Sequence, residues 1–131
     1  MEDTRLLLLA QEAGEVPTIS ALVQSATLRC EDAGYDKRGR RLVLLLNRYR
    51  WEAKGTRIRT ALRVESVTKV TRRNWPGAGA ILELLALRYE GDALMIDFAG
   101  STALRVEIEV PDLILEDMSA PWSAGREPSH D

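Results

Sequence analysis

The spacing of apolar residues changes its period once along the chain. A short apolar run at residues 5–10 predicts a buried strand. Over residues 15–26 apolar positions recur three and four apart, which predicts one amphipathic helix with Pro17 in its first turn. After Ala26 the period falls to two, which is typical of half-buried strands.

The remaining residues predict short strands separated by turn residues. A hairpin turn is expected at residues 36–40, around Gly39. Pro111 and Asp112 could begin a short helix that ends near Met118, and the apolar run at residues 80–89 could be a strand or a helix. The expected strands are residues 27–35 (interrupted at residues 31–32), 41–51, 57–71, 80–89, 94–98 and 102–110.

These elements predict an α+β fold. We expect one N-terminal helix packed on a strongly curled, mostly antiparallel sheet or partial barrel of six to seven strands. The 131 residues fit one globular domain at 1–118 and a tail at 119–131, which docks in part through Trp122 and is mobile beyond it. The longest clean apolar run, residues 42–46, is far shorter than the roughly 20 residues of a membrane-spanning helix.

Charge is unevenly distributed along the sequence. Residues 36–73 hold 13 basic residues and three acids, whereas the whole chain has a net charge of −2. We expect arginines of the strands in this segment to crowd an exposed face, where like charges repel and an anion must compensate them. The candidate contact residues of this arginine face are Arg48, Arg50, Arg57, Arg59 and Arg63.

Two sources could compensate the arginine face. One is an outside partner, namely nucleic acid, a phosphorylated ligand or an acidic protein surface. The other, which we favour, is pairing inside the molecule with acids of the later strands. These acids are Glu83, Asp97, Glu107 and Glu109.

The sequence offers little for catalysis. His130 is the only histidine, so no histidine-based dyad, triad or metal cluster can form. Cys30 is interpreted as a buried thiol, and residues 77–79 as a hairpin turn rather than a phosphate-binding loop. We therefore expect no catalytic residue, no metal and no cofactor. With one cysteine and no signal-peptide pattern, the expected location is the cytoplasm.

One segment of the sequence is distinctive, Leu-Leu-Leu-Asn-Arg-Tyr-Arg-Trp-Glu at residues 44–52. Together with residues 19–24, 61–64, 84–89 and 121–122, it resembles DUF2948, an uncharacterised bacterial domain family. The resemblance implies a bacterial, cytosolic, single-domain protein with no established activity. Within the main segment, Asn47 and Arg48 could belong to a binding surface, or Arg48 could form a structural ion pair.

The leading hypothesis is a small non-enzymatic binding or protein-interaction domain that uses the arginine face. We expect a monomer or homodimer with no membrane partner. The alternative is an RNA- or DNA-binding module on the same arginines, which a pI of about 5.5 disfavours. A third hypothesis is an enzyme or small-ligand protein with a pocket between the helix and the sheet.

Overall fold

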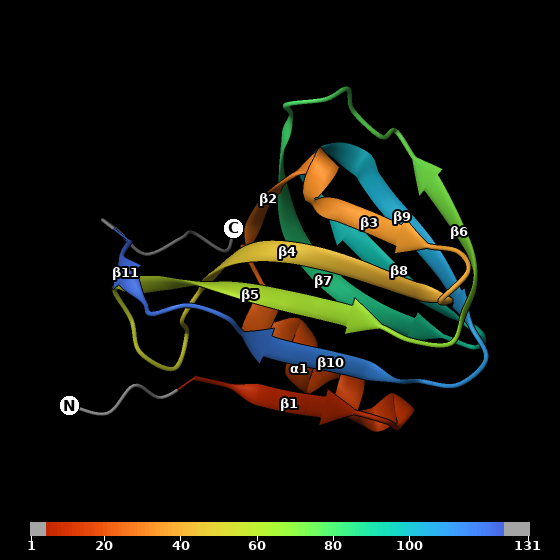
Figure 1. Ribbon diagram of the computed structural model, residues 1–131, viewed down its shortest axis with the longest axis horizontal. Helices are drawn as coiled ribbons and strands as arrows, with labels where there is room; N and C mark the ends of the chain where they lie inside the picture. The colour runs from red at the N-terminus through yellow and green to blue at the C-terminus, as the bar shows by residue number, and fades with distance from the viewer. Residues whose placement is uncertain (1–4, 125–131) are drawn as a thin grey trace.

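The computed structural model describes residues 5–124, which form an α+β fold (Figure 1). Residues 1–4 and 125–131, which include His130 and the expected mobile end of the tail, lie outside the described part. Within residues 5–124, one α-helix of eight residues and a large antiparallel sheet are the main elements. The segment at residues 80–89, for which helix and strand were both open, is a strand.

The elements follow one another in this order: β1 (Leu7–Ala10), the 3-10 helix η1 (Ala13–Glu15), α1 (Val16–Val23), β2 (Thr27–Arg29), η2 (Cys30–Asp32), β3 (Ala33–Asp36), β4 (Arg41–Tyr49), β5 (Thr56–Val64), β6 (Val67–Arg73), β7 (Ile81–Glu90), β8 (Ala93–Phe98), η3 (Ala99–Ser101), β9 (Thr102–Ile108), β10 (Leu113–Asp117) and β11 (Trp122–Ser123).

The strands form one 11-stranded sheet in the order β1-β10-β5-β4-β2-β7-β8-β9-β6, with β3 beside β4 and β11 beside β5. The sheet is neither closed nor strongly curled, so the expected barrel of six to seven strands is wrong. Two expected strands are each divided. The interruption expected at residues 31–32 is the 3-10 helix η2, whereas residues 57–71 are divided by Ser66, whose φ of 59° ends the extended run between β5 and β6.

The expected short helix near the C-terminus is also wrong, because residues 113–117 form strand β10. Leu113, Leu115 and Asp117 are buried while the residues between them are half-buried, which is the alternation of a strand. β10 lies between β1 and β5 and pairs with both in antiparallel register. Two long-range pairings therefore override the local helix-start signal.

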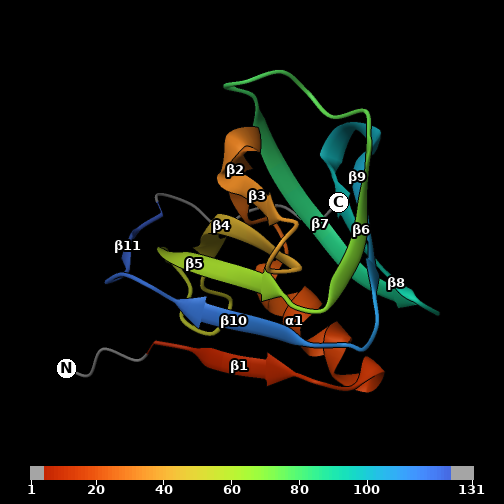
Figure 2. The same ribbon diagram turned by 45° about the vertical axis from the view of Figure 1, so that its right-hand side comes forward.

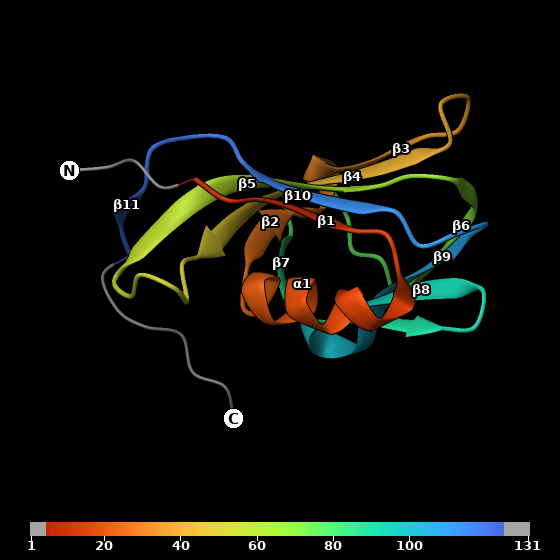
Figure 3. The ribbon, with the colours of Figure 1, turned by 90° about the horizontal axis from the view of Figure 1, so that it is seen from below.

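The sheet is arranged in two layers that meet where β2 pairs with β7 (Figures 2 and 3). β1, β10, β5, β4 and β3 form one layer, and β7, β8, β9 and β6 form the other. α1 lies beside β7 and turns Val16, Ile19 and Val23 into the interior. One continuous apolar core joins α1 to both layers, which holds them together as one unit.

Candidate functional site

Strand β4 turns Arg48 toward the interior rather than to solvent. Its core-facing residues are Leu42, Leu44 and Leu46, and Arg48 continues the same parity opposite Ile58 of β5. The side chain of Arg48 is 0% exposed and that of Arg50 is 9% exposed. The expectation that both lie on an exposed face is therefore wrong.

Arg48 is held by carboxylates from two other parts of the chain. Its Nη2 lies 3.0 Å from Asp117 Oδ2, and its Nη1 and Nη2 donate to the Glu52 carboxylate at 3.0 and 2.8 Å. Asp117, which is 0% exposed at the side chain, also accepts from the Thr60 hydroxyl at 2.7 Å and the Leu6 N–H at 2.9 Å. This cluster joins β4, β5 and β10 to the residue before β1.

Both charges of the Arg48–Glu52 pair are maintained in the folded protein. Burial lowers the pKa of Arg48, but hydrogen bonds with Glu52 and Asp117 outweigh it and leave the pKa raised. Burial raises the pKa of Glu52, but the hydrogen bond from Arg48 and a backbone hydrogen bond outweigh it and leave the pKa lowered. A fully buried, paired guanidinium has no free surface for a ligand, so Arg48 is a structural ion-pair residue.

The other arginines of the expected face lie on the outer side of β5, and each has a polar partner. Arg57 donates to the Asn47 carbonyl at 2.9 Å, and its guanidinium lies 5.8 Å from the Tyr49 ring centroid. Arg59 donates to the Asn47 side-chain oxygen at 3.1 Å, and its Nη2 lies 3.6 Å from Asp32. Arg63 is 37% exposed and lies 3.7 Å from Glu116. Among the described residues, none of the expected acids of the later strands forms an ion pair with these three arginines. The negative charge of Glu83 nevertheless acts on Arg57, where it partly offsets the lowering of the pKa of Arg57 by burial.

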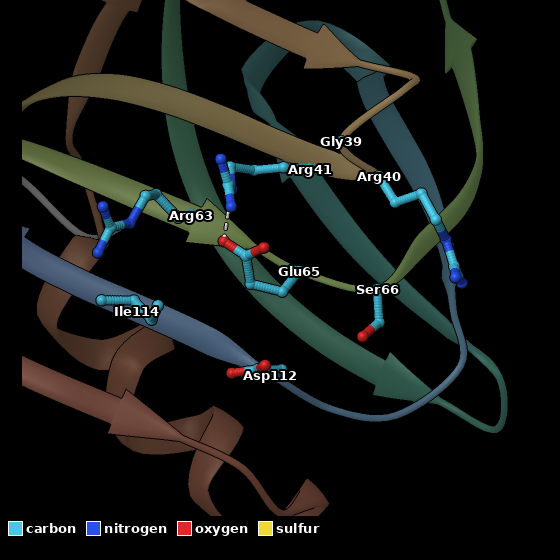
Figure 4. Close-up of a pocket in the computed structure, with 8 residues that line it drawn as sticks. All are labelled: Gly39, Arg40, Arg41, Arg63, Glu65, Ser66, Asp112 and Ile114. Carbon is cyan, nitrogen blue, oxygen red and sulfur yellow. Dashed lines mark hydrogen bonds and ion pairs between the residues drawn. The ribbon is translucent and has the colours of Figure 1, made fainter.

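Arg63 also lines an open groove of about 610 Å³ on this side of the molecule (Figure 4). Arg41 and Glu65 face each other in it with Nε and Oε2 2.7 Å apart, whereas Arg40 points away from the other side chains and pairs with Glu109. The lining residues are Gly39, Arg40, Arg41, Arg63, Glu65, Ser66, Asp112 and Ile114.

Charge in this groove is balanced within the chain. Arg40, Arg41 and Arg63 each have a carboxylate partner, and Asp112 adds a further negative charge. An anion placed in the groove would have to displace an acid from an arginine and would lie near Asp112. The groove of Figure 4 is therefore poorly suited to an anionic partner.

A second hollow, of about 320 Å³, lies between the free edges of β3 and β6, and we refer to it as the slot. β3 pairs with β4 alone and β6 with β9 alone, so within residues 5–124 the two facing edges have no further strand partner (Figure 2). The lining is largely apolar. It consists of Ala33, Tyr35, Leu42, Val70, Arg72, Trp75 and Leu104.

Hydrogen bonds join the segments that flank β3 to β6 and to the residues after β6. At one end of β3 the Val67 N–H donates to the Arg40 carbonyl at 2.9 Å. At the other end the Gly79 N–H donates to Glu31 at 3.1 Å, and Cys30 Sγ lies 3.0 Å from the Gly77 carbonyl. Cys30 is thus a free, buried thiol, as expected.

Five exposed cations lie along the rims of the slot, and we refer to them as the rim cations. Within the described residues none of them makes an ion pair, although Glu107 of β9 is in register with Lys69. They belong to the basic segment noted in the sequence, but alternation alone did not single them out. Only the topology, which leaves β6 and the β3–β4 turn at free edges, does so. The rim cations are Lys37, Arg38, Lys69, Arg72 and Arg73.

Neither a metal site nor a membrane-spanning helix is found among residues 5–124. No group of three or more His, Cys, Asp or Glu side chains in this part could hold an ion. Its helices are too short or too polar to cross a membrane. The described pockets do not lie between α1 and the sheet, where Ile19 and Val23 are at most 1% exposed.

The protein is thus a single α+β domain. Its interior contains ion pairs between side chains, and an apolar slot lies at a free sheet edge. The chain belongs to DUF2948, a family of proteins of unknown function, whose family model matches residues 6–130. Neither the curated proteins nor the solved structures contain a match to this chain.

Proposed function

We propose that the protein is a small non-enzymatic binding domain that takes an acidic segment of another protein at the slot. The observation that carries the proposal is the arrangement of the rim cations, which lack acid partners in the described part of a chain with a net charge of −2. Uncompensated charge beside an apolar hollow raises the local concentration of an oppositely charged partner and orients it.

This proposal moves the contact surface away from the arginine face. Arg48 and Arg50 are buried, and Arg57, Arg59 and Arg63 are engaged by oxygens of the same chain. Their positive charge is already used inside the molecule. Any role for these five arginines in a complex would be to hold β4 and β5 in place.

A protein partner suits the slot better than the alternative partner, nucleic acid. Non-specific binding of single-stranded nucleic acid relies on aromatic side chains that are free to stack on bases. Tyr35 and Trp75 are half-buried, and Trp75 packs edge-on against Phe98 with ring centroids 5.9 Å apart. The slot can take an aliphatic side chain, whereas it presents no open aromatic face to a base.

Titration calorimetry with polyglutamate and with single-stranded DNA at two salt concentrations tests the proposal. We expect polyglutamate to bind to the wild type. The double variant Arg72→Gln/Arg73→Gln should lower the affinity for polyglutamate, by up to roughly fivefold for each exposed charge removed. Arg63→Gln is the matched control, since it removes one charge from the arginine face, and we expect it to leave affinity unchanged.

Three results would count against this assignment. Tighter binding of DNA, with a salt slope equal to several released counterions, would favour the nucleic-acid function. A loss of affinity in Arg63→Gln but not in Arg72→Gln/Arg73→Gln would return the contact surface to the arginine face. Absence of polyglutamate binding at low salt would remove the proposal.

A further inference from the structure

We infer that the acidic partner binds in an extended conformation, adding to the free edge of β6 as a further strand and placing apolar side chains in the slot. This inference rests on the proposed function, and it specifies how the partner binds and which sequence pattern the partner has. A strand at an edge presents N–H and C=O groups that an incoming strand can pair with. Within residues 5–124, β6 pairs with no strand but β9, so one edge of it is open in this way beyond Val67, whose N–H donates to the Arg40 carbonyl.

Alternation along β6 defines what the incoming strand meets. Lys69, Thr71 and Arg73 are in register with Glu107, Arg105 and Ala103 of β9, and they lie on the outer face. Val70 and Arg72 have the other parity and line the slot. The strand therefore meets cations at the outer positions 69 and 73. On the inner face it meets the apolar part of the slot at Val70 and a further cation at Arg72.

The matching partner has acidic and apolar residues in alternation. Acids opposite Lys69 and Arg73 gain cross-strand charge pairing, and an aliphatic residue opposite Val70 buries its side chain between Tyr35 and Leu104. Lys37 and Arg38, in the β3–β4 turn at the Val67 end of the slot, favour further acids at that end of the segment.

A second copy of this chain does not fit the same edge. Pairing of β6 with β6 of another molecule would bring Lys69, Arg72 and Arg73 close to the same three cations, and like charges across strands are destabilising. The occupant is thus a different, negatively charged segment.

The test uses the full chain and a capped synthetic peptide as long as β6, Glu-Val-Glu-Val-Glu-Val-Glu. Three comparison peptides separate the contributions to binding. One has Ser in place of each Val, one has the same composition with its Glu and Val residues grouped, and one is N-methylated at alternate amides. Affinity is measured by titration calorimetry, and backbone pairing by amide hydrogen exchange of β6.

We expect the alternating peptide to bind at least roughly fivefold more tightly than each comparison peptide, since one cross-strand contact alone can supply that factor. Protection from exchange should rise along β6. Val70→Ser should weaken binding of the alternating peptide more than binding of polyglutamate, because it removes an apolar contact and no charge. Leu85→Ser, at an exposed apolar residue of β7 outside the slot, is the control and should change neither affinity.

Equal affinity for all four peptides, sensitive to salt, would overturn strand addition while leaving the proposed anion binding in place. The same holds if N-methylation has no effect. If no peptide binds and polyglutamate does not bind either, the proposed function itself fails.

Discussion

At the scale of the residue, the side chain most important for stability is the fully buried guanidinium of Arg48. We predict that Asp117→Ala destabilises the fold by about 3–5 kcal/mol, because it leaves the buried Arg48 short of a counter-charge and removes the acceptor of the Thr60 hydroxyl and the Leu6 N–H. Urea unfolding followed by circular dichroism gives the free energy of unfolding.

The matched control is Glu109→Ala, which removes the partner of Arg40 from an ion pair with exposed side chains. Such pairs contribute about 0–1 kcal/mol, so this variant should unfold close to the wild type. Equal losses in the two variants would show that the Arg48 cluster is not what stabilises this end of the sheet.

Glu52 gives the same cluster a pH dependence. Its pKa is lowered in the folded state, so its contribution to stability is present above the ordinary value of 4.5 and is lost as the pH falls through the folded value. We predict that the difference in unfolding free energy between wild type and Glu52→Gln is largest near neutral pH and shrinks below pH 4.5. Urea titrations across the acid range measure it, and a difference that stays constant would contradict the assignment.

At the scale of the element, one residue determines where β5 ends and β6 begins. Ser66 has a φ of 59°, a conformation that costs an L residue roughly 1–2 kcal/mol and that a β-branched side chain tolerates poorly. We predict that Ser66→Val destabilises the fold by about 1 kcal/mol or more, whereas Ser66→Gly is at least as stable as the wild type. Thermal unfolding compares the two, and equal melting temperatures would argue against this strain.

The faces of the strands could be predicted only where apolar and polar residues alternate regularly along them. Leu104, Val106 and Ile108 alternate with polar residues in the expected strand at 102–110, and all three are buried, as such an alternation indicates. In β4 the run at residues 42–46 is apolar at both parities, so nothing local indicated that Arg48 points inward. The partner that settles its orientation, Asp117, lies 69 residues later in a segment that carried a helix-start signal.

The placement of the rim cations could not be predicted for a related reason. The excess of basic residues at 36–73 is a property of the sequence, but which of them lack partners depends on strand order. Arg63 finds Glu116 because β5 pairs with β10, whereas Arg72 and Arg73 have no described partner because β6 is the last strand of the sheet. Both facts arise from contacts between distant segments.

At the scale of the whole molecule, stability should respond to salt in two opposed ways. Screening weakens the exposed pairs that join the basic segment to acids elsewhere, such as Arg40–Glu109 and Arg63–Glu116. The same screening relieves repulsion among the rim cations. We therefore predict that Arg72→Gln/Arg73→Gln is more stable than the wild type at about 10 mM salt, where the screening length is roughly 30 Å, and loses that advantage at about 1 M.

Urea unfolding at the two salt concentrations measures this difference, and Arg63→Gln, which removes a paired charge, should instead be slightly less stable at low salt. The sign of the change in unfolding free energy of Arg72→Gln/Arg73→Gln at low salt tests whether these charges are available to a partner. If removal of Arg72 and Arg73 lowered stability there, these charges would already be compensated inside the molecule. An acidic partner would then gain no attraction from these charges, and contacts in the slot alone would have to supply the binding affinity.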